Sequence, residues 1–341
     1  MSRGIGMKAL IRADGEFNVG MGHIIRCMAL YDELIKNNVE CIFVSRKDKV
    51  VESYFKDKKV RYILMEAMEL DGEKIEIENI IKNYNIDVII TDSYNINEEY
   101  LLFLKSLSRY LISIDDNYLF EYPSDIIVNP NVYAERKKYN NKDSKYLLGG
   151  QYCILREEFR KRSSKNIKVK AENILITMGG TDVNNVTPFI IKAIKKIHGI
   201  NINVIVGKGF ENRELIEESY KDEQNIKLIY NPKDMRILME NADICISSSG
   251  STLYELASLG VPTLFVIQAD NQLRLAEYME KSQIMINLGW YYNLKEKALL
   301  DELINIIDNQ GIRLKLSADS KKIINVDGVK NIVKKIIQYF L

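Results

Sequence analysis

The chain has 341 residues, 46% of them hydrophobic and 28% charged, a globular balance that predicts two domains at about 150 residues each. Its 48 Lys and Arg nearly cancel its 47 Asp and Glu, which argues against a nucleic-acid-binding or membrane-coating protein. The four cysteines are scattered singly, no signal-peptide stretch opens the chain, and no apolar run approaches the roughly 20 residues of a membrane span, so we expect a cytoplasmic protein with reduced thiols.

Short β-rich runs alternate with helical patterns through the first half of the chain. Four runs are nearly continuous in apolar residues, as in parallel strands that helices cover on both faces. They span residues 8–13, 39–45, 86–92 and 109–116. Between the first two, residues 23–36 repeat apolar side chains at spacings of three and four, which predicts a helix. Asp115 and Asp116, at the end of the fourth run, either line a pocket or cap the next segment.

The same alternation starts again in the second half. The expected strands span residues 172–178, 202–207, 225–230, 242–247 and 261–267, and three helices are expected within 293–341. The rhythm breaks in the charged stretch 131–171, so we place a domain boundary near residue 165. The sequence therefore predicts an α/β protein of two doubly wound, Rossmann-like domains, residues 1–165 and 166–341.

The first candidate site follows the first expected strand and opens the first helix. Its polar and glycine residues are Arg12, Asp14, Gly20, Gly22, His23 and Arg26. The glycines let the backbone approach a ligand, and a helix start offers unpaired N–H groups. A dinucleotide-binding GxGxxG loop would carry a third glycine where this chain has Ile25, so the loop gives little support to NAD binding.

His23 distinguishes this loop from an ordinary glycine turn. The positive end of a helix disfavours a charged imidazole, so we expect a neutral His23 that can accept a proton as a general base. It follows the carboxyl end of an expected strand, where α/β sheets bind their ligands. The alternative is that His23 only caps the helix or packs in the core. The other histidine, His198, is expected to lie at a helix end, and two histidines cannot form a multi-histidine metal centre.

Two loops in the second half suit a phosphate group. One contains Gly179, Gly180 and Thr181; the other contains Ser249, Gly250, Ser251 and Thr252. Each follows an expected strand and combines glycine N–H groups with hydroxyls, as anion-binding loops do, although the first would also fit a plain tight turn.

Further polar side chains follow these loops. Glu255 lies one turn beyond Ser251 on the same helix face, where a carboxylate can accept hydrogen bonds from a ribose diol; the alternative is a surface charge. Asn271 and Gln272 belong to a polar cluster suited to the sugar or phosphate, or to an ordinary loop. A base in one domain and a phosphate-and-ribose cradle in the other predict a nucleotide-sugar enzyme with its cleft between the domains.

At these residues the chain resembles the PseG/SpsG family, UDP-sugar hydrolases of pseudaminic acid biosynthesis related to B-type glycosyltransferases such as MurG. The similar segments occur in order along nearly the whole chain and include residues 11–30, 92–96, 178–185 and 247–262. The resemblance implies a GT-B fold with an interdomain cleft. It also implies hydrolysis of UDP-2,4-diacetamido-2,4,6-trideoxy-altropyranose by attack of water at the anomeric carbon. Attack opposite the diphosphate predicts inversion, and we expect no metal or cofactor.

The resemblance also assigns roles to single residues. His23 matches the catalytic histidine of the family, Tyr94 an active-site tyrosine and Asn271 an asparagine near the sugar. The two glycine loops and Glu255 match the nucleotide side, and we count Asp92 among the substrate-binding residues. Ser93 departs from the family, which often has histidine there, so the departure concerns sugar recognition and not the proposed base.

Two other functions fit the same residues. A MurG-like glycosyltransferase would use His23 to deprotonate an acceptor hydroxyl instead of water. A sensor of nucleotide sugars would bind without turnover, which a base-competent His23 argues against. We expect hydrolysis of a UDP-sugar by a monomer or weak oligomer, without nucleic acid or stable membrane insertion.

Overall fold

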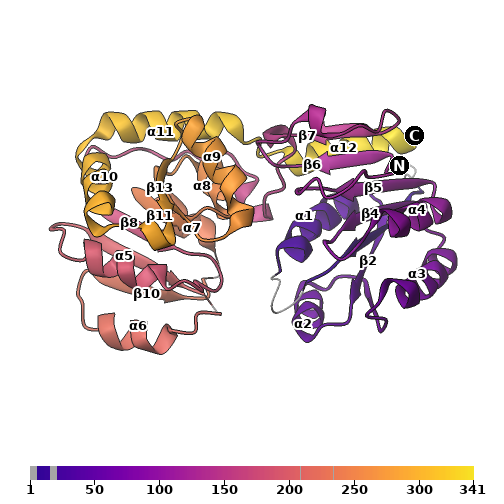
Figure 1. Cartoon of the computed structure of the whole chain (residues 1–341), viewed down its shortest axis with the longest axis horizontal. Helices are drawn as coiled ribbons and strands as arrows, with labels where there is room; N and C mark the ends of the chain where they lie inside the picture. The colour runs from indigo at the N-terminus through magenta and orange to yellow at the C-terminus, as the bar shows by residue number, and fades with distance from the viewer. Residues whose placement is uncertain (1–5, 16–20, 208, 233) are drawn as a thin grey trace. The chain divides into compact units, whose positions relative to one another are not determined.

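The computed structural model describes residues 6–15, 21–207, 209–232 and 234–341. The chain forms two compact units, each built on one parallel sheet (Figure 1). Unit 1 comprises Met1–Glu157 and Asp327–Leu341, and unit 2 comprises Glu158–Val326. The predicted class, two parallel α/β domains, is confirmed.

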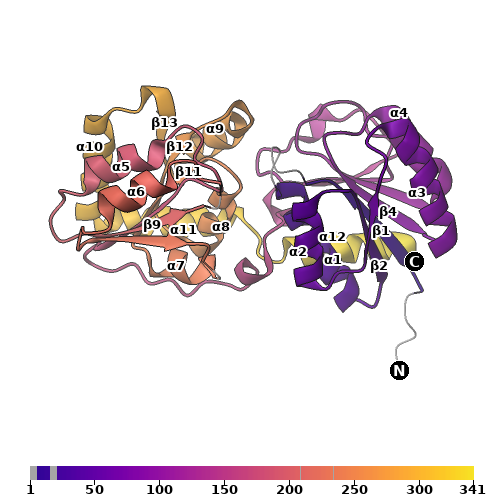
Figure 2. The same cartoon turned by 90° about the horizontal axis from the view of Figure 1, so that it is seen from below.

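Unit 1 contains a seven-stranded sheet in the order β3-β2-β1-β4-β5-β6-β7. The strands are β1 (Lys8–Ala13), β2 (Glu40–Arg46), β3 (Tyr62–Met65), β4 (Val88–Asp92), β5 (Tyr110–Ile114), β6 (Ile126–Asn129) and β7 (Lys145–Leu148). The helices are α1 (Gly22–Lys36), α2 (Lys49–Lys58), α3 (Leu70–Tyr84), α4 (Glu98–Leu107) and α12 (Gly328–Phe340). Helices cover both faces of this sheet (Figure 2).

Successive residues of the central strand β1 belong to two different cores. Ala9 and Ile11 join the cluster formed with α1, α2 and α12, whereas Leu10 joins the cluster formed with α3 and α4. Side chains alternate across a strand, so burial on both faces requires a continuous apolar run. This explains why apolar runs predicted β1, β2, β4 and β5, whereas the four-residue strands β3, β6 and β7 were too short to give such a run.

The last helix, α12, packs on unit 1 although it follows unit 2 in the sequence. Val329, Ile332 and Ile336 are buried in the same core as α1. A Cβ on Gly328 would lie 2.2 Å from the Cys153 backbone oxygen, so this close approach needs glycine. The chain therefore crosses at Glu157 and returns at Asp327, whereas the predicted boundary was near 165 with the last helix in the second domain. An amphipathic pattern predicts that a helix is buried on one face but does not say which sheet it covers.

Unit 2 contains a six-stranded parallel sheet in the order β10-β9-β8-β11-β12-β13. The strands are β8 (Asn173–Thr177), β9 (Asn201–Val206), β10 (Ile226–Tyr230), β11 (Ile244–Ser248), β12 (Thr263–Ile267) and β13 (Ile286–Trp290). The helices are α5 (Val186–Ile194), α6 (Arg213–Tyr220), α7 (Met235–Asn241), α8 (Thr252–Leu259), α9 (Leu273–Lys281), α10 (Glu296–Asp308) and α11 (Gln310–Ile323).

Both sheets reverse their strand order next to their first strand. In unit 1 the chain builds outward from β1 to β3 and then restarts on the other side with β4; unit 2 does the same between β8 and β11. At such a switch point two neighbouring loops diverge to opposite faces and leave a crevice at the carboxyl ends of the strands. The fold therefore places the loops after β1, β4, β8 and β11 where α/β proteins bind ligands.

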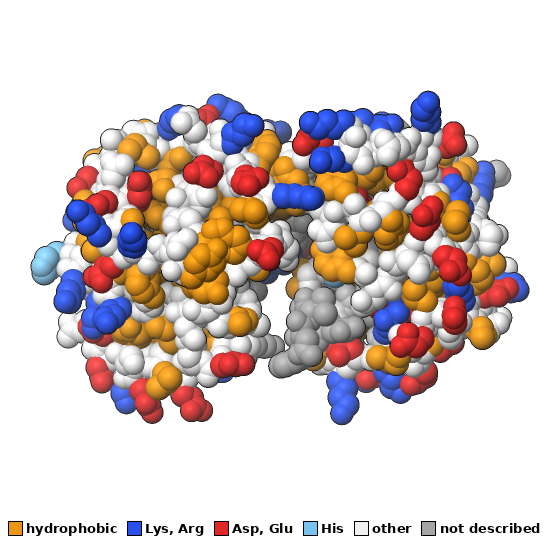
Figure 3. All heavy atoms as spheres, in the orientation of Figure 1, with side chains coloured by type: hydrophobic (Ala, Val, Ile, Leu, Met, Phe, Trp, Pro, Cys, Tyr) orange, Lys and Arg blue, Asp and Glu red, His pale blue; other side chains and the backbone are white. Residues whose placement is uncertain are grey.

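The molecular surface matches the balanced composition. On the face in Figure 3, basic and acidic side chains are interspersed. Within the described ranges, none of the helices combines the length and apolar character needed to cross a bilayer.

Candidate active site

Polar side chains from three neighbouring strand ends meet at the carboxyl edge of the unit 1 sheet. Helix α1, which follows β1, carries His23; β4 ends in Asp92; and Asp116 follows β5. The strand order β1-β4-β5 brings these ends side by side. Of the predicted residues in the first loop, Gly20 lies outside the described residues, and Gly22 is the first residue of α1.

His23 is held by the carboxylate of Asp92. Its Nδ1 lies 2.7 Å from Asp92 Oδ1, and both side chains are buried. A carboxylate only accepts hydrogen bonds, so Nδ1 carries the hydrogen and donates it, leaving the lone pair on Nε2. Arg26 Nη2 also lies 2.9 Å from Nδ1, but this nitrogen donates to Asp92 Oδ1. The Tyr94 ring contacts the imidazole edge-on, with 4.4 Å between ring centroids. Contacts on two sides thus orient an imidazole whose Nε2 can accept a proton.

Arg26 links this pair to a second carboxylate. Its Nε donates to Asp92 Oδ2 at 2.5 Å, Nη1 donates to Asp116 Oδ2 at 2.7 Å, and Nη2 also donates to Asp92. Burial by itself would raise the pKa of Asp92, but the charge of Arg26 and the hydrogen bonds from Arg26 and His23 hold it well below its usual range. Asp92 is therefore a permanent anion at neutral pH and a stable acceptor for the imidazole N–H.

Tyr94 supplies a neutral hydroxyl beside the histidine. Its hydroxyl donates to Asp116 Oδ2 at 3.0 Å, and the residue is 42% exposed. Burial and the negative charge of Asp116 raise the pKa of Tyr94 above its usual value. Tyr94 therefore stays protonated at neutral pH, which suits hydrogen bonding and excludes a role as a base.

Arg12 and Asp14 form a separate buried network next to these residues, which we call the His23 cluster (His23, Arg26, Asp92, Tyr94 and Asp116). Arg12 is fully buried; its Nε and Nη2 donate to Glu73 at 2.6 and 2.9 Å, and its Nη1 donates to Asp14 at 2.5 Å. Asp14 also accepts from Ser93 Oγ at 2.9 Å. Arg12 and Asp14 were expected to bind substrate, but both are directed to protein partners and thus support the loops after β1 and β4. Ser93, the departure from the family pattern, belongs to this buried support.

Sequence reasoning missed Glu73 altogether and left Asp116 undecided. Glu73 is fully buried on α3, where it also accepts from Arg46 and from the Tyr100 hydroxyl. Its only signal in the sequence is a carboxylate on an otherwise apolar helix face. Asp115 caps the next segment, because it accepts from two backbone N–H groups of the next turn, whereas Asp116 contacts Arg26 and Tyr94.

In unit 2, the loop after β8 presents glycine backbone at an open surface. Gly179 has a φ of 86°, which favours glycine, and no described atom lies within 4 Å of where a Gly180 Cβ would be. Behind the loop, a Cβ on Gly207 would lie 2.3 Å from the Gly180 oxygen. Thr181 is exposed, whereas Asp182 accepts from the first N–H groups of α5. The loop thus packs against Gly207 on one side, while the Cα of Gly180 faces open space on the other.

The loop after β11 forms a second bare glycine surface. Gln272 Oε1 accepts from Ser249 Oγ and from the Gln268 N–H, both at 3.0 Å, so its amide nitrogen is left to face Gly250. Among the described residues, no side chain caps α8, whose N-cap is Ser251. The structure therefore brings Ser249, Gly250 and Gln272 together at an uncapped helix start, an arrangement suited to an anion. Thr252 and Glu255 lie in the first turn of α8, and Asn271 is exposed in a short turn before α9.

A charge placed on this loop tests whether it binds phosphate. Replacing Gly250 with aspartate should weaken UDP binding about tenfold to a hundredfold, because the carboxylate would stand within a few ångströms of the diphosphate. The protein should still fold, since the nearest described atom to a Gly250 Cβ is the Gln272 amide nitrogen at 4.0 Å. Gly250→Asn, of equal size and no charge, is the matched control. Calorimetric Kd values that rise equally for both variants, or for neither, would contradict phosphate binding here.

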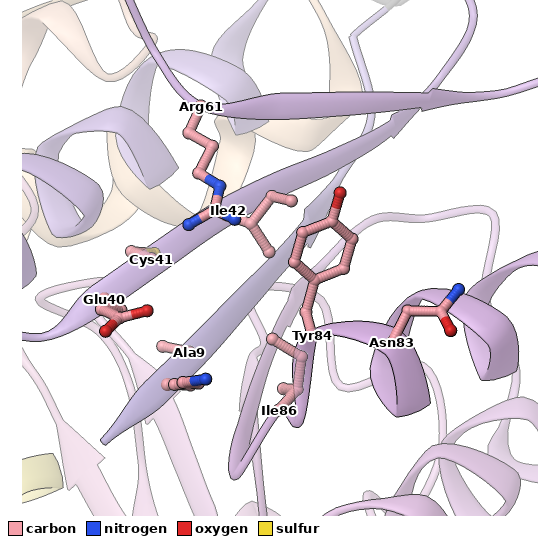
Figure 4. Close-up of a pocket in the computed structure, with 9 residues that line it drawn as sticks. Ala9, Glu40, Cys41, Ile42, Arg61, Asn83, Tyr84 and Ile86 are labelled. Atoms are coloured by element: carbon pink, nitrogen blue, oxygen red, sulfur yellow. The ribbon is translucent and has the colours of Figure 1, made fainter. Parts of the chain in front are cut away.

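A hollow lies at the opposite edge of the unit 1 sheet. It is lined by the amino ends of β1 and β2 together with Arg61 and Tyr84, whose side chains face it (Figure 4). Its lining shares no residue with the His23 cluster. The candidate active site, with its buried ion pairs, therefore lies at the carboxyl edge of the sheet and not at this hollow.

Comparison with known proteins places the chain among sugar-nucleotide proteins. The glycosyltransferase family 28 C-terminal domain matches residues 173–336. An uncharacterized protein of Methanocaldococcus jannaschii is 32% identical over 93% of this chain and 69% of its own length. The spore coat polysaccharide biosynthesis protein SpsG of Bacillus subtilis is 24% identical over 94% of each chain. The UDP-2,4-diacetamido-2,4,6-trideoxy-beta-L-altropyranose hydrolase of Campylobacter jejuni is 27% identical over 81% of this chain and 97% of its own.

The chain belongs to the PseG/SpsG family. Its fold extends the relation to more distant proteins: MurG of Acinetobacter baumannii superposes with a TM-score of 0.73 over 98% of this chain and 99% of its own, at 15% identity. This PseG/SpsG member therefore has the GT-B type of fold, as the resemblance implied.

Proposed function

We propose that this protein hydrolyses a UDP-sugar, UDP-2,4-diacetamido-2,4,6-trideoxy-altropyranose, to UDP and the free sugar. The observation that carries the proposal is the 2.7 Å contact between His23 Nδ1 and Asp92, which leaves Nε2 as the proton acceptor. The name of the Campylobacter jejuni relative supports this substrate. The two glycine loops of unit 2 support binding of the UDP part.

In the proposed reaction, His23 Nε2 takes a proton from water as the water oxygen attacks the anomeric carbon. The bond between this carbon and the diphosphate oxygen breaks, and its electron pair leaves with UDP. Asp92 stabilises the imidazolium that forms, as carboxylates do beside catalytic histidines. Attack opposite the leaving group inverts the anomeric carbon.

Unit 2 has a different part in the proposal. N–H groups of the loops at Gly180 and Gly250, with the start of α8, would hold the negative diphosphate, and Glu255 would accept from the ribose hydroxyls. A diphosphate held in this way is a good leaving group, so a second carboxylic acid to protonate it is not needed. Asn271 would contact the sugar.

A MurG-like glycosyltransferase is the second candidate, favoured by the match of residues 173–336 to the family 28 domain. The same His23 would then deprotonate an acceptor hydroxyl.

Incubation with the UDP-sugar alone separates the two functions. Hydrolysis predicts that UDP and free sugar appear in equal amounts at a rate that added acceptors do not change. UDP release that requires an acceptor would favour the transferase, and UDP at the uncatalysed rate under both conditions would overturn both.

The proposal also includes the cellular setting. Within the part of the chain that the structure describes, no disulfide joins any of the four buried cysteines, which suits a reducing compartment such as the cytoplasm. A monomer or weak oligomer would suffice, because each chain carries both sets of residues.

A further inference from the structure

Of the two carboxylates that contact Arg26 within the described ranges, Asp92 and Asp116, only Asp116 has an oxygen without a protein donor. Its Oδ2 accepts from Arg26 at 2.7 Å and from the Tyr94 hydroxyl at 3.0 Å. Among the described residues, no donor contacts its Oδ1, and its side chain is 14% exposed. Asp92, by contrast, is buried and has both oxygens engaged. Asp116 therefore presents a fixed acceptor at the surface of the cluster.

The position of this oxygen relates it to the reacting carbon. One guanidinium, that of Arg26, contacts both Asp116 and the His23 imidazole, through Nη1 at 2.7 Å and Nη2 at 2.9 Å. A general base lies within hydrogen-bond reach of the water that attacks the anomeric carbon. An acceptor held by the same guanidinium as the base belongs to the same site as the reacting carbon. The sugar N–H nearest to that carbon is the one on the neighbouring ring carbon.

We propose that Asp116 selects the sugar by accepting, through Oδ1, the N–H of the acetamido group on the ring carbon next to the anomeric carbon. This inference rests on the proposed function and deepens it. The carboxylate is an acceptor without a donor of its own, so an N–H satisfies it and an oxygen at the same place repels it. Arg26 and Tyr94 prevent the carboxylate from turning away, because both hold Oδ2. Asp116 is a specificity-determining residue, whereas His23 is the catalytic base.

The substitution Asp116→Asn reverses the hydrogen-bonding sense at this one position. Arg26 can only donate, so the asparagine carbonyl oxygen must take the place of Oδ2 and the amide nitrogen that of Oδ1. The contacts within the cluster are kept, while the exposed acceptor becomes a donor. Because the change in shape is small, the variant is expected to fold.

The test compares two substrates that differ in one atom: the UDP-diacetamido sugar and its analogue with an acetoxy group on the carbon next to the anomeric carbon. Asp116→Asn should lower kcat/KM for the acetamido substrate about tenfold to a hundredfold, the effect of losing a hydrogen bond to a charged group. For the acetoxy analogue it should leave kcat/KM unchanged or raise it, because the amide can donate to the ester oxygen. The Kd for UDP alone should stay within about twofold.

Equal losses for both substrates, or no loss for either, would overturn the role of Asp116. Asp71→Asn is the matched control, because it makes the same chemical change at a side chain on α3 that is 95% exposed and pairs with Lys74. If the unmodified protein hydrolyses neither substrate, the proposed function fails. The Kd values of the two UDP-sugars for the parent and Asp116→Asn proteins then still decide whether Asp116 selects the N–H.

Discussion

Replacing His23 with alanine should lower kcat for UDP release about 10²- to 10⁴-fold, the usual contribution of a general base. KM should change little, because the proposed contacts to UDP lie in unit 2. His198→Ala is the matched control, because the other histidine is exposed beyond the end of α5. Steady-state kinetics with the UDP-sugar measure both variants. A His23→Ala protein that keeps a third or more of the parent kcat would rule out His23 as the base.

Replacing Asp92 with asparagine should lower kcat by a similar factor while leaving His23 in place. An amide offers one acceptor oxygen where the carboxylate offers two, and Arg26 competes for it. If the amide nitrogen faces Nδ1, the imidazole must carry its hydrogen on Nε2, where it can no longer accept one from water. In serine proteases the same change costs about 10⁴ in kcat.

The matched control for Asp92→Asn is Asp87→Asn, just before the amino end of the same strand, where Asp87 accepts from the Lys8 N–H. It should keep the parent kcat. An Asp92→Asn protein with normal kcat would show that the orientation of His23 does not depend on the carboxylate.

Asp92 should also affect stability in acid. Its pKa in the folded protein lies well below the value of about 4 in the unfolded chain. It therefore stabilises the fold above about pH 4, and this contribution is lost as the pH falls below that value. Denaturant unfolding between pH 3 and pH 7 should show a smaller decline for Asp92→Asn than for the parent. A parallel decline in both proteins would mean that Asp92 contributes nothing to the acid sensitivity.

Much of the fold follows from local patterns that are visible in the sequence. Continuous apolar runs predicted the inner strands because both faces of these sheets are buried, and the glycine loops were recognised because each comes directly after such a run. The short strands β3, β6 and β7 and the edge strand β13 were missed. The first three have only four residues each, and β13 is partly buried at every position, so its sequence is not a continuous apolar run.

The site was predictable in its parts but not in its connections. His23 could be singled out as a histidine at a helix start, whereas its partner Asp92 comes from a strand that neighbours β1 only because the sheet reverses its order there. Arg12 has the same polar character as a ligand-binding arginine. Arg12 has a structural role because it is paired with Glu73 of α3. These two residues are far apart in the sequence, so neither segment by itself predicts the pair.

The return of α12 to unit 1 sets the order in which the protein can be completed during synthesis. A ribosome makes residues 158–326 before it makes the helix whose Val329 and Ile332 close the core beneath α1. Synthesis of unit 1, which carries His23, therefore begins before that of unit 2 and ends after it, whereas unit 2 is one continuous segment. A fragment cut at Glu157 would expose the apolar side chains that α12 covers, so isolating the amino-terminal half requires that residues 327–341 be supplied with it.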